Sequence, residues 1–177
     1  DQFTGQDVED AMRQWSDDRD SRCRCLKFNT RMMAFFAVDL EDVRMTTRLE
    51  DEKTHFLPFN QGSAGAGNVG GVGNPSNPEG YAVSHLWEVA LQKDSLLDIV
   101  HKFLHLEVKE ETEVDARGCE VRRKKQRIIF PRYHQLDSVR RVVADVRKNG
   151  SGKNYLIQHS AGSGKSNSIA WTAYRLA

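Results

Sequence analysis

Apolar residues recur at helical spacing in two long polar stretches of the chain. In the charged segment 6–19 they fall at steps of four and three, at Val8, Met12 and Trp15. After Pro131 the same spacing returns, at Leu136, Val139, Val143 and Val146. The first pattern predicts a surface helix with one narrow apolar stripe. The second predicts an amphipathic helix that opens near Pro131 and closes at Asn149-Gly150.

Shorter apolar runs between these helices have the length and alternation of strands. Residues 32–39 form a compact apolar run, and residues 43–49 alternate roughly by twos. Residues 54–59 suggest a third strand. A helix followed by three short strands predicts a small mixed α/β unit.

Residues 62–80 are rich in glycine, proline and asparagine and contain no lysine. This composition predicts a loop, flexible or facing a substrate. A phosphate cradle is disfavoured here, because such cradles need a preceding strand, a following helix and usually a lysine.

Residues 84–106 have the pattern of one or two helices. Ser95 and Asp98 have the spacing of a capping pair between them. His101 and His105 are four residues apart, so on one helix they would share a face, as paired metal ligands do. Their neighbours are apolar and no glutamate stands between them, so half-buried packing histidines are favoured over a metal site.

The segment 107–127 separates its charges along the chain. Residues 107–115 are mainly acidic, and residues 122–127 are basic except for one glutamine. This pattern predicts a domain boundary, with the basic run as a solvated linker. The alternative is contact with a nucleic-acid backbone, which would depend strongly on salt.

The sequence near the end of the chain has the order strand, glycine-rich turn, lysine-serine and helix. Residues 154–158 predict the strand, and His159–Ser166 (HSAGSGKS) the turn. Residues 166–177 predict a helix whose apolar side carries Ile169, Ala170, Ala173 and Leu176. This order is typical of a triphosphate-binding loop, although His159 replaces the usual leading glycine.

Each residue type in this loop has a chemical reason. Gly162 and Gly164 lack a Cβ, so the backbone can adopt strained dihedrals and bring its N–H groups close to phosphate oxygens. Lys165 supplies a positive charge for the terminal phosphates at the positive end of a helix dipole. Ser166 supplies a hydroxyl for Mg²⁺.

Gln135 lies 30 residues before Lys165, with one predicted helix and one predicted strand between them. A glutamine amide offers both donors and acceptors, so Gln135 can read the edge of an adenine. A solvated residue near a helix start is the simpler alternative.

Bulk composition limits the partners. The formal net charge is +1, so any contact with nucleic acid must come from local patches. No apolar run is long enough for a membrane span. The three cysteines (Cys23, Cys25 and Cys119) lack a zinc spacing, and their odd number favours a reducing cytosol. The chain starts without methionine and stops within a predicted helix, so we expect a fragment.

These motifs resemble the restriction and translocation (R) subunit of type I restriction–modification enzymes. The motor part rests on FPRYHQLDSVRRVV and LIQHSAGSGKSNSIAW. The earlier part rests on TGQDVEDA, FFAVDLEDVRMTTRL, THFLPFNQG and LWEVALQKDSLLDIVHKFLHL. The motor motifs alone would indicate only a superfamily-two helicase-like ATPase.

The resemblance implies an α/β chain with the C-terminal part of a restriction-endonuclease-like nuclease domain (1–115) and a basic linker (116–130). The start of a RecA-like motor domain (131–177) would follow. It implies ATP and Mg²⁺ as cofactors, with Lys165 catalytic and Ser166 a metal ligand. The implied nucleotide-binding residues are Gln135, Gly162, Ser163, Gly164, Lys165 and Ser166. Duplex DNA and the methyltransferase and specificity subunits would be partners, in a bacterial or archaeal cytoplasm without membrane contact.

The sequence also departs from that family. The nuclease carboxylates and the Glu-x-Lys pair belong upstream of Asp1, and Asp18 stands where a tyrosine often follows the glutamine matched by Gln14. The later helicase motifs are missing, so we expect this polypeptide alone neither to cut DNA nor to sustain ATP hydrolysis. The alternatives are a helicase or remodeller without nuclease, a non-catalytic DNA-binding module and, less well supported, a small-molecule kinase.

Overall fold

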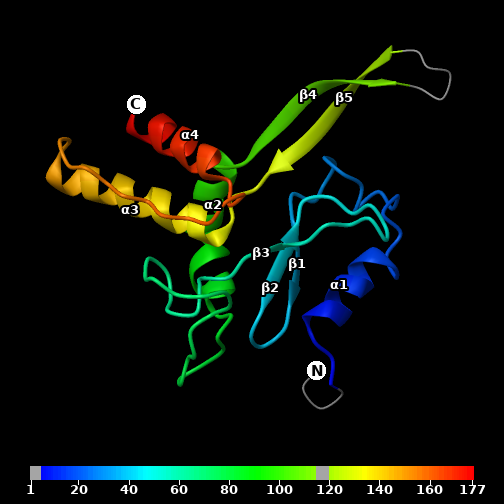
Figure 1. Cartoon of the computed structure of the whole chain (residues 1–177). Helices are drawn as coiled ribbons and strands as arrows, with labels where there is room; N and C mark the ends of the chain where they lie inside the picture. Colours follow the sequence, from blue (N-terminus) through cyan, green and yellow to red (C-terminus); the bar gives the residue numbers. More distant parts are fainter. Residues whose placement is uncertain (1–4, 115–119) are drawn as a thin grey trace.

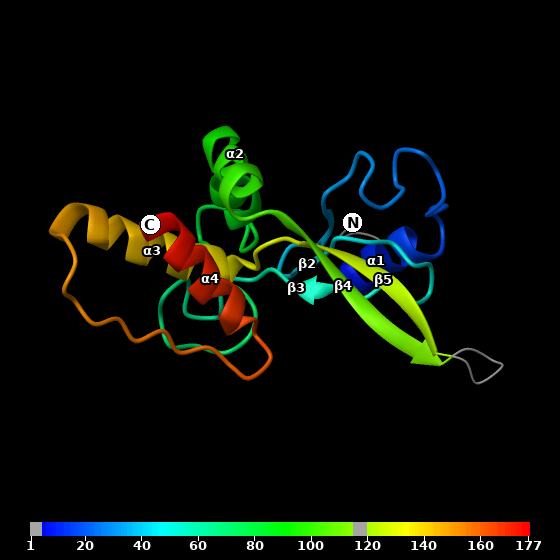
Figure 2. The same cartoon turned by 90° about the horizontal axis from the view of Figure 1, so that it is seen from above.

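The computed structural model describes residues 5–114 and 120–177; Asp1, Thr4, Asp115 and Cys119 lie outside the described residues. The described part is mixed α/β with two small antiparallel sheets (Figures 1 and 2). The coarse fold-class prediction is therefore confirmed. In chain order the elements are α1 (Val8–Ser16), β1 (Phe35–Val38), β2 (Val43–Thr46), β3 (Leu57–Pro58), the π-helix η1 (Leu86–Ala90), α2 (Lys93–Lys102), β4 (His105–Val114), β5 (Glu120–Ile129), α3 (Tyr133–Asn149) and α4 (Lys165–Leu176).

Helix α1 confirms the predicted surface helix. It begins where the carboxylate of Asp7 accepts hydrogen bonds from the backbone N–H groups of Glu9 and Asp10, satisfying donors that have no partner within the helix. Val8 is buried, and Trp15 donates its indole N–H to the carbonyl oxygen of Phe36 at 3.1 Å. The apolar stripe thus packs α1 against β1.

The three predicted strands form one antiparallel sheet in the order β1-β2-β3. Phe36 lies opposite Met45, and Met45 lies opposite Leu57. The β1–β2 turn closes because the Asp39 carboxylate accepts hydrogen bonds from the N–H groups of Glu41 and Asp42, as aspartate does in many tight turns. The strand predictions are confirmed over shorter bounds.

Residues 62–80 form the predicted loop, which hydrogen bonds tie to its surroundings. Within the loop, Gly62 N–H donates to the carbonyl oxygen of Gly73 at 2.8 Å. Asn74 donates its side-chain amide to the carbonyl oxygen of Glu41 at 2.8 Å, and Arg141 of α3 donates to that of Ala66 at 2.9 Å. These contacts hold the loop against both the β1–β2 turn and α3.

Two predictions for residues 84–106 are wrong. Ser95 caps no helix: it lies inside α2 and donates its hydroxyl to the carbonyl oxygen of Ala90. Asp98 accepts hydrogen bonds from Arg140 of α3 instead. His101 and His105 share no helix face either, because α2 ends at Lys102 and His105 opens β4.

The predicted basic linker is also replaced by a strand. β4 and β5 form a long hairpin that projects from the body of the molecule (Figure 1). Glu110 lies opposite Lys124, and their charged groups are 3.7 Å apart. Lys125 pairs with Glu111 at 3.5 Å. Opposite charges therefore face each other across the two strands, a stabilising arrangement that charge counting along the chain does not reveal.

One hydrophobic core joins the three-stranded sheet to α3 and α4. The sheet contributes Val43, Met45 and Phe59, and α3 and α4 contribute Tyr133, Leu136, Val139 and Trp171. Trp171 also donates its indole N–H to the carbonyl oxygen of Phe103 at 2.8 Å.

Helix α3 runs from Tyr133 to Asn149 and is capped by Gly150, which confirms the predicted amphipathic helix and its end. Among the helices of the described residues, none has the length and apolar character needed to cross a membrane.

Candidate nucleotide-phosphate site

The glycine-rich turn leads directly into a helix. Gly162 and Gly164 have φ values of +73° and +81°, in the left-handed region that glycine enters without steric cost. Gly164 is the N-cap of α4, which begins at Lys165. The first N–H groups of a helix have no intrahelical acceptor, so those of Lys165 and Ser166 are available to an anion at this end.

Lys165 is held over its own loop. Its ammonium group donates hydrogen bonds to the carbonyl oxygens of Ser160 at 2.9 Å and His159 at 3.2 Å. The side chain is exposed, as are Ser160, Ala161 and Gly162. A phosphate oxygen can therefore replace the carbonyl oxygens without displacing a buried side chain.

Gln135 joins the start of α3 to this loop. Its side-chain oxygen accepts from the backbone N–H of Arg132 at 2.9 Å, and its amide nitrogen donates to the carbonyl oxygen of Gly164 at 2.8 Å. Gln135 is only 2% exposed. Each half of the amide retains one further donor or acceptor, so adenine reading stays a prediction, while the contact between Gln135 and the loop is structural.

Two residues that the sequence analysis did not single out also touch the loop. The guanidinium of Arg132 donates to the carbonyl oxygen of Gly162 at 3.4 Å. The Nε2 atom of His134 lies 3.1 Å from the carbonyl oxygen of Ser163. The rings of His134 and His159 meet edge to face, with centroids 4.6 Å apart. The available signal was their position directly beside Gln135 in PRYHQ.

Burial and nearby positive charge favour the neutral form of both histidines. Burial is the main cause that lowers the pKa of His134, and the nearby His159 and Arg132 lower it further. Burial also lowers the pKa of His159, assisted by the positive charge of Lys165. The loop thus carries its positive charge on Lys165 and Arg132.

Two of the three serines of the loop, Ser163 and Ser166, differ in exposure. Ser163 is 4% exposed, and its hydroxyl is buried without a hydrogen-bond partner. Its backbone N–H donates to the carbonyl oxygen of Ser160 at 3.3 Å. Ser166 is exposed on the first turn of α4. Of these two hydroxyls, only that of Ser166 is open to a metal ion.

The predicted strand at 154–158 is not formed. The segment is extended and exposed, with Leu156 at 92%, and has no strand partner within the described residues. A strand needs a neighbour to complete its hydrogen bonds, and the described strands pair only among themselves. Asp145 of α3 instead binds the start of the segment through Lys153 and the Tyr155 hydroxyl.

The apolar side predicted for α4 is also wrong. Ile169 and Leu176 are exposed, whereas Ser168 and Trp171 are buried. Helix α4 packs through the face of Trp171 and Arg175, because Arg175 pairs with Asp98 of α2 at 3.1 Å. Arg140 of α3 pairs with the same carboxylate at 3.0 Å, so Asp98 connects α2, α3 and α4.

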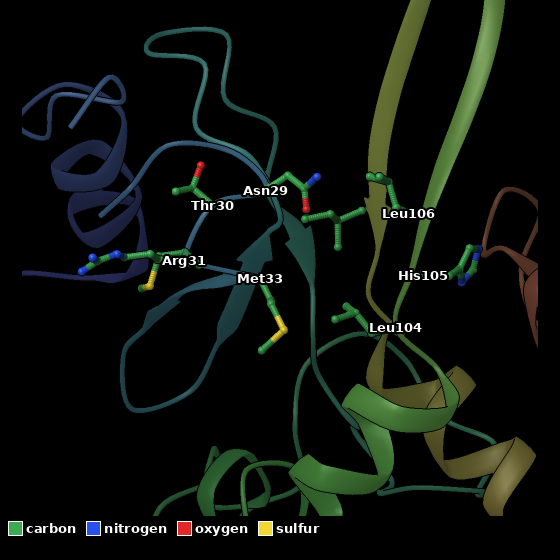
Figure 3. A pocket seen from close by; sticks show the side chains of 9 residues that line it. Asn29, Thr30, Arg31, Met33, Leu104, His105 and Leu106 are labelled. Atoms are coloured by element: carbon green, nitrogen blue, oxygen red, sulfur yellow. The ribbon is translucent and has the colours of Figure 1, made fainter. Parts of the chain in front are cut away.

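Two surface cavities lie away from the phosphate loop. One, of about 380 Å³, is formed by residues 29–33 and the base of the hairpin (Figure 3). Leu104 and Leu106 face residues 29–33, while His105 points to the opposite side. The other, of about 340 Å³, lies between the end of α2 and α4. Neither is lined by residues of the phosphate loop, which forms an open surface.

Comparison with known proteins adds no relative. No family model, no curated protein and no solved structure matches the chain. The assignment of a function to the site therefore rests on its residues and their geometry.

Proposed function

We propose that this chain is the ATP-binding portion of a type I restriction enzyme R subunit. It would comprise the C-terminal part of a nuclease domain (1–115), a connecting segment (116–130) in which Glu120–Ile129 form β5, and the start of a RecA-like motor domain (131–177). The intact protein would use ATP and Mg²⁺ to translocate duplex DNA and then cleave it, together with methyltransferase and specificity subunits. The proposed setting is a bacterial or archaeal cytoplasm.

The observation that carries this proposal is the loop at 159–166. Two left-handed glycines, an exposed lysine ammonium and the first turn of α4 converge on one open surface. A Cβ built on Gly162 would meet no atom within 4 Å, so the cradle has room for an oxyanion. This donor set is the one that binds phosphate groups at helix N-termini.

The loop also offers a ligand for magnesium, and Gln135 is the proposed contact for the nucleotide base. The exposed Ser166 hydroxyl is a hard oxygen ligand, and Mg²⁺ commonly takes one or two protein ligands plus phosphate oxygens. Lys165 would neutralise the terminal phosphates, and Gln135 would meet the adenine. Hydrolysis in this class needs further groups that position the attacking water, so here we assign only binding and charge neutralisation.

The direct test is MgATP binding to the whole chain, measured by titration calorimetry. Lys165→Ala should weaken binding roughly tenfold or more, equivalent to about 1.4 kcal/mol. The matched control is Lys148→Ala, which removes an exposed lysine at the far end of α3. In the intact subunit with its partners, Lys165→Ala should abolish DNA-dependent ATP turnover. Retained binding and turnover would refute the assignment.

The hairpin bears on the alternative of a non-catalytic DNA-binding module. β5 carries Arg122, Arg123, Lys124, Lys125 and Arg127, but Lys124 and Lys125 pair with glutamates of β4. Replacing residues 122–125 by alanine and titrating duplex DNA at two salt concentrations separates the possibilities. Loss of duplex binding together with its salt dependence would favour the binding module. Binding that survives argues against it.

A further inference from the structure

Cys23 and Cys25 bring two thiols together on the surface. Their sulfur atoms are 3.1 Å apart. Both side chains are exposed and neither is in a disulfide. The pair lies in the segment between α1 and β1, and Figure 1 shows this segment on the side of the molecule away from α4.

The backbone of the turn holds the pair in place. Cys23 N–H donates to the carbonyl oxygen of Asp20 at 2.9 Å, and the carbonyl oxygen of Cys23 accepts from the N–H groups of Leu26 and Lys27, each at 2.9 Å. These bonds fold the chain around the two cysteines. Without the turn, residues two apart in an extended chain would still point to the same side but would not be held at this separation.

The shared hydrogen bond makes the two sulfurs chemically unequal. The bond from Cys25 lowers the pKa of Cys23, and the same bond raises the pKa of Cys25. A thiolate is the attacking form of cysteine. These directions favour Cys23 as the attacking thiolate and Cys25 as the thiol that reacts second.

We infer that Cys23 and Cys25 form a reversible dithiol–disulfide site that exchanges with small-molecule disulfides. The inference is independent of nucleotide binding. Within residues 5–114 and 120–177, no third histidine, cysteine or carboxylate joins the pair to complete a metal-binding group. Two exposed thiols in contact are suited to exchange chemistry rather than to a closed zinc site.

The exchange proceeds in two balanced steps. The Cys23 thiolate attacks one sulfur of R–S–S–R, forming a mixed disulfide and expelling RS⁻. Cys25 then loses its proton to solvent, attacks the Cys23 sulfur and expels the second RS⁻. The protein loses two electrons and two protons, and the small disulfide becomes two thiols. The ring spans one residue and is exposed, so its bond should be readily reduced again.

Ring closure would act on a neighbouring cavity wall. The pair lies shortly before residues 29–33, which line the cavity of about 380 Å³. The sulfurs must approach from 3.1 Å to a bond length of about 2.05 Å, which tightens the turn. We expect ring closure to shift residues 29–33 at the wall of this cavity and to leave the phosphate loop unchanged.

The test uses the whole chain with Cys119→Ser, so that only the pair can react. Glutathione disulfide is added, and intact mass is followed with time. The expected product has lost two hydrogens and carries no adduct. In the matched variant Cys25→Ser, a single glutathione adduct should persist on Cys23. In the matched variant Cys23→Ser, a single glutathione adduct should likewise persist on Cys25, because no second thiol is left to close the ring.

A denatured control separates the folded site from the sequence motif. Ring closure should be faster in the folded chain than in concentrated urea by a factor of at least about five, because the turn holds the two sulfur atoms together. Stable adducts on both cysteines of the folded chain would overturn the inference. Equal rates with and without urea would overturn it as well. Circular dichroism of each variant checks that the fold is retained.

Discussion

The side-chain amide of Gln135 donates a hydrogen bond to the main-chain carbonyl oxygen of Gly164 at 2.8 Å. One residue opens α3 and the other caps α4, and 28 residues separate them in the chain. The bond therefore connects the proposed base-reading position to the turn that would hold the phosphates. Because the Gln135 side chain holds the backbone of the loop, it should affect phosphate binding without contacting the phosphate itself.

Gln135→Ala should loosen the loop. It removes both amide hydrogen bonds and leaves the Arg132 N–H and the Gly164 carbonyl without these partners, which costs about 1–3 kcal/mol. Urea unfolding should show this loss, and calorimetry should show weaker MgATP binding. Gln126→Ala, at an exposed position of β5, is the control and should change neither quantity. Unchanged stability in Gln135→Ala would show that the contact is not formed.

Gly164→Ala should be more damaging than Gly162→Ala. Both changes place alanine at a positive φ, which costs about 1–2 kcal/mol. At Gly164 the new Cβ would also lie 2.5 Å from the Gln135 amide nitrogen, whereas at Gly162 it enters open space. Thermal unfolding and MgATP titration should rank the two variants in this order. In the double variant Gly164→Ala/Gln135→Ala, part of the loss should disappear because the clash is relieved; strict additivity would contradict it.

Asp98→Asn should separate the three helices that Asp98 connects. Arg140 and Arg175 lose their charged acceptor and keep at most a neutral amide oxygen, at a cost of about 1.5–3 kcal/mol. The control is Asp137→Asn, which breaks a more exposed pair with Arg141 and should cost about 0.2–1 kcal/mol. Denaturant titrations measure both. Equal losses would show that Asp98 acts as an ordinary surface charge.

The same carboxylate predicts a pH dependence. Burial alone would raise the pKa of Asp98, but hydrogen bonds and charges from Arg175 and Arg140 outweigh it, so the folded pKa lies below the ordinary value of an aspartate. Its stabilising contribution is thus complete above the unfolded pKa and is lost as the pH falls through the folded pKa. Unfolding free energy measured across this acidic window should fall more steeply in the wild type than in Asp98→Asn. Parallel curves would contradict the assignment.

Two histidines, His85 and His134, predict a second pH dependence at higher pH than that of Asp98. For histidine the charged form is the protonated imidazole, whereas for aspartate it is the deprotonated carboxylate. Burial lowers the pKa of His85 and His134 below the ordinary value of a histidine. The unfolded chain therefore takes up protons first, and stability falls as the pH drops below about 6.5 and levels off below the folded pKa values. His85→Gln and His134→Gln should each flatten this part of the curve. His55→Gln, at an exposed position, should leave it unchanged, and an equal effect there would contradict the prediction.

Local signals in the sequence were sufficient for several elements. Apolar spacing placed α1 and α3, and Asn149-Gly150 marked the end of α3. The glycines at 162 and 164 and the following lysine marked a turn into a helix. Each of these features depends on residues within a few positions of one another, which is why one sequence was enough.

Other features depend on partners distant in the chain. The acidic and basic runs suggested a linker, because β5 carries charged residues on both faces and its first eight residues are exposed. Asp98 suggested a cap because its arginine partners lie 42 and 77 residues away. Residues 154–158 suggested a strand, but a strand forms only where a neighbour supplies hydrogen bonds.

The sequence by itself therefore determined the helices, the turn at 159–166 and the residue types that suit a phosphate. Only the tertiary structure decided that the two charged runs pair as a hairpin, that Asp98 connects three helices and that Gln135 holds Gly164. The physical reason is range. Caps, glycine dihedrals and helical periodicity act within a turn or two of backbone, whereas strand pairing, ion pairs and packing depend on which distant segments the fold brings into contact.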